Sequence, residues 1–248
     1  MCRPLRGALF VEGEGENDAA PLLLKNLWAH LALQPYVSWT VLWRHNALKE
    51  DHILKLGLDR HEARLRNGSF NLLIVMFDAD FKKADKVACP KTHAPQSAQI
   101  IRNFNLPIPA AVVLPHKEYE HWFVACLPQW AGQAVVDGGT GQVIGRFAAD
   151  TSSAHDHING RDGKGIIDRH LVSGRYGERT HQPALTAMLD FPYLCHADRN
   201  EVADAVGFGP LRRACQFLAQ NIGQHGAVYP APPAPPQPAQ LPNIALEL

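Results

Sequence analysis

The hydrophobic pattern along the chain alternates between short, continuous apolar runs and stretches with helical spacing. The runs predict strands at Leu5–Val11, Tyr36–Trp43, Leu72–Phe77 and about Ala110–Leu114. The stretches between and after them predict helices from Asn17 or Asp18 to about Leu33, and at about Asp59–Arg66, Pro95–Phe104 and Glu118–Cys126. Strands that alternate with helices are typical of parallel sheets with right-handed crossovers. The expected fold class is therefore α/β, a Rossmann-like parallel sheet flanked by helices.

The pattern changes after about residue 130. Ala134–Phe147 holds Asp137-Gly138-Gly139 between two apolar runs and predicts a hairpin. Ser152–Lys164 is polar and rich in glycine, which favours a loop, and further helices are expected near Pro183–Leu189 and Pro210–Ile222. From Tyr229 onward Pro and Ala dominate, which indicates an extended tail. We expect a core at 1–130, a C-terminal extension (a hairpin plus helices, packed on the core) at 131–228, and a Pro-rich tail at 229–248.

Charge and cysteine content argue against several classes of protein. Lys and Arg together number 24, as do Asp and Glu, so the net charge gives no general argument for nucleic acid, membrane or an acidic partner. The five cysteines are scattered without a CxxC pair, which disfavours a disulfide framework or a zinc ribbon and favours a reducing, cytoplasmic compartment. The longest strongly apolar run, Leu72–Phe77, is too short to span a bilayer, so no membrane partner is expected.

Acidic side chains follow two of the predicted strands. Glu12 lies in a glycine-containing loop after the first strand, and Asp78 and Asp80 directly follow the third. The carboxyl ends of parallel strands meet at one edge of a sheet, where ligands bind. The loop is not a dinucleotide fingerprint, because Asp18 stands where the third glycine is needed and the loop glutamates repel a pyrophosphate. Carboxylate oxygens suit Mg²⁺ or Mn²⁺, so the pattern predicts a metal that in turn holds phosphate.

A simpler interpretation is that Asp78 and Asp80 cap the next helix and that Glu12 is a solvated loop acid. Either motif alone would be explained in this way. Two acidic strand ends in one sheet favour the metal site over this simpler interpretation.

These motifs together resemble the Toprim domain, which topoisomerases, bacterial primases and nucleases of the overcoming-lysogenization-defect (OLD) type share. The resemblance depends on "FVEG" (10–13), "IVMFDAD" (74–80) and "EYEHWF" (118–123). A similar pattern of V-E-G-x-x-E, D-x-D and E-x-W marks an uncharacterised bacterial group of small Toprim-like proteins, some linked with phage defence. The resemblance covers about residues 5–127, with weaker echoes at 163–171, 182–190 and 212–218.

The resemblance implies Mg²⁺-dependent phosphodiester chemistry on DNA or RNA. It makes Asp78 and Asp80 the main metal ligands, and Glu12 a ligand or a general acid or base near the scissile phosphate. Glu16 and Glu120 would then complete or neighbour a second ion. In two-metal sites the ions lie roughly 3.5–4 Å apart, activate a water and stabilise the leaving oxygen.

The segment "EYEHWF" leaves the choice of glutamate open. Residues two apart do not share a helix face, so Glu118 and Glu120 cannot serve one ion unless the turn is irregular. The family pattern favours Glu120. Alternatively, both glutamates are solvated and Trp122 and Phe123 form the core side of a helix.

Basic residues and histidines add weaker candidates. Lys164 is a candidate catalytic residue that stabilises developing charge on a phosphate, or else an exposed loop lysine. His155 and His157 fit an imidazole pair on an extended loop, although thirteen histidines make chance pairs common. Four lysines follow the acidic pair: Lys82, Lys83, Lys86 and Lys91. They predict either a basic rim for a nucleic-acid backbone or merely a solvated face.

More than one function is compatible with the sequence. The leading interpretation is a Mg²⁺-dependent nuclease or related phosphoryl-transfer protein that acts on nucleic acid, with phage defence as its context. The alternative is a non-catalytic Toprim-like regulatory or defence-complex subunit with a protein partner such as an ATPase, which the Pro-rich tail favours. A third is a glycosyltransferase, since "VMFDAD" also resembles the Asp-x-Asp that holds a nucleotide-sugar diphosphate through Mn²⁺. Glu12 has no evident use in that fold.

Overall fold

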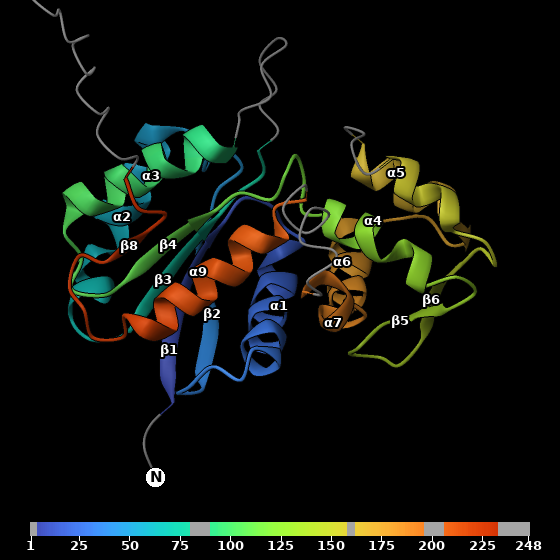
Figure 1. Cartoon of the computed structure of the whole chain (residues 1–248), viewed down its shortest axis with the longest axis horizontal. Coiled ribbons are helices and arrows are strands. Elements are labelled where there is room, and N and C mark those ends of the chain that lie inside the picture. The colour runs from blue at the N-terminus through green and yellow to red at the C-terminus, as the bar shows by residue number, and fades with distance from the viewer. Residues whose placement is uncertain (1–3, 80–89, 158–161, 196–205, 233–248) are drawn as a thin grey trace, which may run out of the picture.

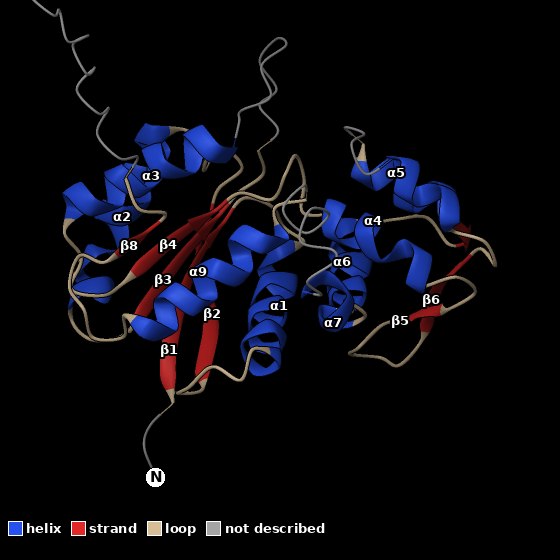
Figure 2. Cartoon of the chain, in the orientation of Figure 1, coloured by secondary structure: helices blue, strands red, loops and turns tan. Residues whose placement is uncertain are grey.

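A five-stranded sheet lies at the centre of the molecule (Figures 1 and 2). The structure, a computed structural model, describes residues 4–79, 90–157, 162–195 and 206–232. Neighbouring strands are parallel throughout and follow the order β2-β1-β3-β4-β8. Their bounds are β1 Leu5–Val11, β2 Val37–Arg44, β3 Leu72–Met76, β4 Ala110–Val113 and β8 Val228–Tyr229. This Rossmann-like α/β arrangement confirms the predicted fold class.

Helices cover both faces of this sheet. On one face lie α1 (Glu16–His30) and α9 (Phe208–Gln220), and on the other α2 (Asp51–Arg66) and α3 (Pro90–Phe104) (Figure 1). Side chains of a strand alternate between faces, so Leu9 of β1 joins the α1 core while Phe10 joins the α2 core. Strands buried on both faces read as continuous apolar runs, and for this reason β1 and β3 could be located from the sequence.

A smaller antiparallel sheet occupies the end of the molecule opposite β8 (Figure 1). Its strands are β5 (Ala134–Val136), β6 (Val143–Phe147) and β7 (Leu171–Ser173), in the order β5-β6-β7. The predicted hairpin is confirmed, and its turn is fixed by Asp137, whose Oδ1 accepts from the backbone N–H of Gly139 at 2.9 Å. Around this sheet are α4 (His121–Cys126), α5 (Gly163–His170), α6 (Glu178–Ala187) and α7 (Phe191–Cys195), with 3₁₀ turns at Leu127–Gln129 and Ser152–His157.

The two sheets share one hydrophobic core. Val135 and Phe147 of the small sheet and Leu185 of α6 belong to the same buried cluster as Leu23 of α1. The extension therefore packs on the α1 face of the main sheet. Of its last elements, α9 covers that face and β8 is an edge strand of the sheet itself.

Several predicted boundaries were wrong, and α2 and α4 show how long-range contacts override the local pattern. Helices α3 and α6 also begin earlier than predicted, at Pro90 and Glu178. Helix α2 begins at Asp51, well before Asp59, and continues through Gly57. A Cβ at Gly57 would lie 1.9 Å from the Trp43 ring, so glycine serves close packing there and does not mark a helix end. Helix α4 begins only at His121, after a turn that contains Glu118.

The predicted Pro-rich tail also began too early. Tyr229 is a strand residue that pairs with Ala111 of β4. Arg102 of α3 donates from Nη2 to the carbonyl oxygen of Val228 at 3.0 Å and to that of Pro230. The rest of the predicted tail, 233–248, lies outside the described residues.

Candidate functional site

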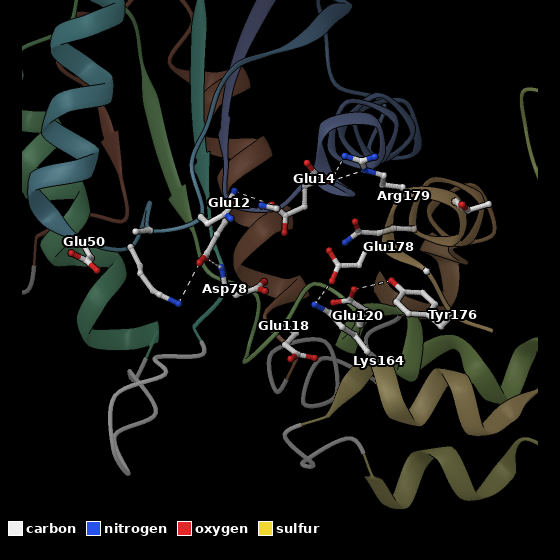
Figure 3. Close-up of a pocket in the computed structure, with 18 residues that line it drawn as sticks. Glu12, Glu14, Glu50, Asp78, Glu118, Glu120, Lys164, Tyr176, Glu178 and Arg179 are labelled. Carbon is white, nitrogen blue, oxygen red and sulfur yellow. Dashed lines mark hydrogen bonds and ion pairs between the residues drawn. The ribbon is translucent and has the colours of Figure 1, made fainter.

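A cavity of about 1080 Å³ opens at the carboxyl edge of the main sheet (Figure 3). One wall, here called the sheet wall, is formed by the β1–α1 loop, the start of α1 and the end of β3. The other, here called the helical wall, is formed by α5, α6 and the segment before α6. The carboxylates that line the cavity are Glu12, Glu14, Glu16, Glu50, Asp78, Glu118, Glu120 and Glu178.

The two acidic strand ends meet in this cavity. Strands β1 and β3 are direct neighbours, with Val11 opposite Met76, so the residues that follow them emerge side by side. The backbone N–H of Asp78 donates to Oε2 of Glu12 at 3.1 Å, while Nζ of Lys49 lies 3.3 Å from Oε1 of Glu12. The expected convergence of Glu12 and Asp78 is therefore confirmed, and Lys49 is a partner that the sequence did not reveal.

Glu16 is buried beneath the β1–α1 loop and sets the shape of that loop. Its Oε2 accepts from the backbone N–H groups of Glu12 at 2.9 Å and Gly13 at 2.8 Å. Burial raises the pKa of Glu16 to about 7, and the nearby Glu120 and Glu12 carboxylates add to the rise. Glu16 thus orders the loop and also adds negative charge to the cavity.

Asp78 stands at the centre of the acidic cluster. Its Oδ1 accepts from the backbone N–H of Tyr119 at 3.0 Å. Burial raises the pKa of Asp78 well above its ordinary value, and repulsion from Glu16, Glu120 and the other neighbouring glutamates raises it further. A proton or a cation relieves such repulsion.

The turn before α4 brings both Glu118 and Glu120 to the cavity. Glu120 is the N-cap of α4, so helical spacing does not separate the two side chains. Oε2 of Glu118 accepts from the backbone N–H of Gly163 at 3.1 Å, and the hydroxyl of Tyr176 donates to Oε1 of Glu120 at 2.7 Å. Burial raises the pKa of Glu120 to about 7, although Lys164 and Tyr176 act to lower it. Both glutamates therefore line the cavity, and the preference for Glu120 as the metal-associated residue stays a prediction.

Lys164 faces the same carboxylates from the first turn of α5. Its Nζ lies 2.5 Å from Oε1 of Glu178. Burial acts to lower the pKa of Lys164, but the carboxylates of Glu120, Glu178 and Glu118 outweigh it and raise the pKa, so the ammonium persists at neutral pH. Lys164 was expected to lie in a loop, but it lies in helix α5. The Asp162 side chain caps this helix by accepting from the backbone N–H of Gly165 at 2.8 Å.

Several residues of the helical wall were not identified from the sequence. Besides Lys164, this wall contributes Tyr176, Glu178, Arg179 and Gln182. The only sequence signal among them is Gln182, which opens the weak echo at 182–190. Gln182 packs so closely on the β1–α1 loop that a Cβ at Gly15 would lie 1.7 Å from its Oε1. Glycine at this position leaves room for the Gln182 side chain and for the Glu178 carbonyl oxygen, which would lie 3.0 Å from the same Cβ.

The carboxylates of the cavity are oxygen donors of the kind that hard divalent cations prefer, but the described residues do not form a complete ligand set. Among the described residues, no three His, Cys, Asp or Glu side chains are arranged to hold an ion. The expected ligand Asp80 lies outside those residues, as do Lys82, Lys83, Lys86 and the side chains of His155 and His157. Carboxylates whose pKa values rise through burial and mutual repulsion are nevertheless the groups that Mg²⁺ or Mn²⁺ stabilises.

No family model, curated protein or solved structure matches this chain. Among the described residues, no helix has both the length and the apolar character needed to cross a bilayer. The function must therefore be argued from the cavity and its residues.

Proposed function

We propose that this protein is a Mg²⁺- or Mn²⁺-dependent nuclease, or a related phosphoryl-transfer enzyme, that acts on DNA or RNA. The supporting observation is the meeting of Glu12, Glu16, Asp78, Glu118 and Glu120 in one cavity at the carboxyl edge of a parallel sheet. Ligands bind at such edges, and divalent cations bind clustered carboxylates. The Toprim resemblance of the sequence supports the same assignment and suggests phage defence as its context.

The residues divide into binding and charge-stabilising roles. Glu12 and Asp78, with Asp80, are the proposed metal ligands, and the metal when bound supplies Lewis-acid stabilisation of the phosphate. Lys164 keeps its positive charge and is placed to stabilise negative charge on a phosphate oxygen. Glu120, with its Oε1 held by Tyr176 and its pKa near 7, suits proton transfer at neutral pH.

Incubation with mixed nucleic acids tests this function. The purified protein is offered single- and double-stranded DNA and RNA with Mg²⁺ or Mn²⁺, beside an EDTA control. The variant Asp78→Asn keeps the shape of the side chain and removes its charge, and Asp59→Asn, an exposed aspartate of α2, is the matched control. Cleavage that needs metal and Asp78 but not Asp59 supports the proposal. No cleavage of any substrate by folded wild type with either ion contradicts it.

A non-catalytic binding role is the second candidate. Val136 and Val143, which are paired in the β5–β6 hairpin, and Val172 of β7 are 43%, 60% and 64% exposed. Exposed apolar side chains on a small sheet favour contact with a protein partner, such as an ATPase in a defence complex. This role predicts stabilisation by metal without cleavage. The glycosyltransferase alternative is less favoured, because Glu12 contacts Asp78 within the site and has no evident use in that reaction.

A further inference from the structure

Two arginines from separate elements meet on one carboxylate beside the acidic cavity. Arg44 is the last residue of β2, Arg179 is the second residue of α6, and Glu14 lies in the β1–α1 loop between them. Nη1 of Arg44 is 2.9 Å from Oε1 of Glu14, while Nε and Nη2 of Arg179 are each 2.5 Å from Oε2 (Figure 3 labels Glu14 and Arg179). Each carboxylate oxygen therefore has its own arginine.

These ion pairs are exposed and contribute little to the stability of the fold. The side chains of Arg44, Glu14 and Arg179 are 39%, 44% and 76% exposed, and exposed ion pairs are worth little because water and salt compete with them. The Glu14 carboxylate is the anion that the loop presents to this arginine pair.

The arrangement of donors also fits a phosphate. The guanidinium fork binds carboxylate and phosphate with the same planar geometry, so Glu14 occupies the place that a phosphate group can take. Arg44 lies opposite Val11 in the sheet, and Val11 directly precedes Glu12. The arginine pair is thus adjacent to the carboxylates proposed to act on the scissile phosphate. In a polynucleotide, the phosphates next to a cleaved one lie within reach of such a neighbouring site.

We propose that Arg44 and Arg179 bind a backbone phosphate of the nucleic acid next to the reacting phosphate, and that Glu14 covers this site until the substrate displaces its carboxylate. The inference rests on the proposed function and adds to it a substrate class, a polynucleotide with at least one phosphate beside the reacting one. Glu14 then acts against binding, which sets it apart from the other glutamates of the cavity.

Binding of a labelled oligonucleotide tests the inference without requiring turnover. Fluorescence anisotropy is measured over a range of salt concentrations, with Ca²⁺ in place of Mg²⁺ as the oxygen-bound cation. Arg44→Gln and Arg179→Gln are each expected to weaken binding about tenfold and to reduce the slope of log K against log salt by about 1. Glu14→Gln is expected to tighten binding about tenfold, because the arginines are released.

Matched variants separate this site from general electrostatics. Arg60→Gln removes an exposed arginine of α2, and Glu62→Gln removes a carboxylate that pairs with Arg66 at 2.6 Å on the same helix. Both controls are expected to bind like wild type. Equal effects of Arg60→Gln and Arg179→Gln, or weaker binding by Glu14→Gln, overturn the inference.

The outcomes also separate this inference from the proposed function. Cleavage that persists with no change of affinity in either arginine variant overturns the phosphate site and leaves the nuclease function intact. Binding that depends on both arginines without any cleavage supports the phosphate site and contradicts the enzyme. A wild type that neither binds nor cleaves contradicts both.

Discussion

The two walls of the cavity differ in charge and in how the chain builds them. The sheet wall presents Glu12, Glu16 and Asp78, and burial raises the pKa of the last two. The helical wall presents an ammonium at Lys164 and a hydroxyl donor at Tyr176. The carboxylates of the sheet wall repel one another, and the hydrogen bonds within that wall do not remove this repulsion. The helical wall supplies hydrogen-bond donors and a positive charge that offset part of the negative charge. We therefore propose that the cation of the proposed enzyme binds chiefly to the sheet wall.

The largest expected effects come from the sheet wall. Asp78→Asn should lower metal-dependent activity by at least about 100-fold, because an anionic metal ligand is lost. For the same reason it should reduce the rise in melting temperature that Mg²⁺ or Mn²⁺ produces. If Glu12 is a ligand, Glu12→Gln should likewise reduce both the activity and the metal-induced rise in melting temperature. If Glu12 chiefly transfers protons, the variant should keep that rise but lose turnover. Thermal shift and cleavage are measured in parallel. A full metal-induced shift in Asp78→Asn would exclude it as a ligand.

On the helical wall, Lys164→Gln should lower the turnover number about 100-fold, because the substitution removes a preorganised cation near the phosphate. The metal-induced thermal shift should survive, since an ammonium is not a ligand. Lys55→Gln, on an exposed position of α2, is the control and should retain wild-type turnover. Equal turnover in both variants would show that Lys164 merely pairs with Glu178.

A pH titration of metal-free stability tests the raised carboxyl pKa values of the cavity. The carboxyl pKa values of Glu16 and Glu120 rise from an ordinary 4.5 to about 7 on folding, so the native state binds protons more tightly than the unfolded state. The free energy of unfolding in EDTA should therefore fall as pH rises from about 4.5 to about 7. The expected cost is on the order of 3 kcal/mol per group.

Variants isolate this effect from other titrating groups. His61 and His116 have lowered pKa values, which makes stability rise with pH near the ordinary histidine value and offsets part of the fall. Subtracting the denaturation profile of Glu120→Gln from that of wild type leaves the Glu120 contribution. A difference that does not change between pH 5 and pH 8 would contradict the raised pKa.

The smallest expected effect concerns the contact between Tyr176 and Glu120. Tyr176→Phe removes the hydroxyl that donates to Oε1 of Glu120 and should lower metal-free stability above pH 7 by about 1 kcal/mol. The pKa of Glu120 should rise further, because a donor to its charged form is gone. Tyr36→Phe, at a half-exposed position, is the control for chemical denaturation. An equal loss in a Glu120→Ala background, which has no acceptor oxygen at this position, would show that the hydroxyl acts elsewhere.

The sheet wall could be predicted from the sequence because its signals are local. β1 is one apolar run that ends at an acidic loop, and its predicted bounds, Leu5–Val11, are those observed. Asp78 directly follows a second such run, and parallel pairing alone brings it beside Glu12.

The helical wall could not be predicted, because its chemistry depends on tertiary contacts. The glycine-rich segment Ser152–Lys164 suggested a loop, yet Gly163 lies in helix α5 against Glu120, where a Cβ would be 3.0 Å from the Glu120 Cβ. Tyr176 and Arg179 have no sequence pattern that marks them, because their partners lie far away in the sequence. Spacing rules likewise misled for Glu118, since they presume a helix where the chain makes a turn.

The pairing of β8 with β4 has a consequence for synthesis on the ribosome. These two strands are neighbours in the sheet, but along the sequence they are separated by the whole segment from Leu114 to Ala227, which includes the small sheet. The main sheet therefore cannot be completed until that long segment has been translated, and its closure is a non-local step of the kind that slows folding. The carboxylates of the sheet wall are translated before Lys164 and Tyr176, so this acidic edge is synthesised before the side chains that offset part of its charge.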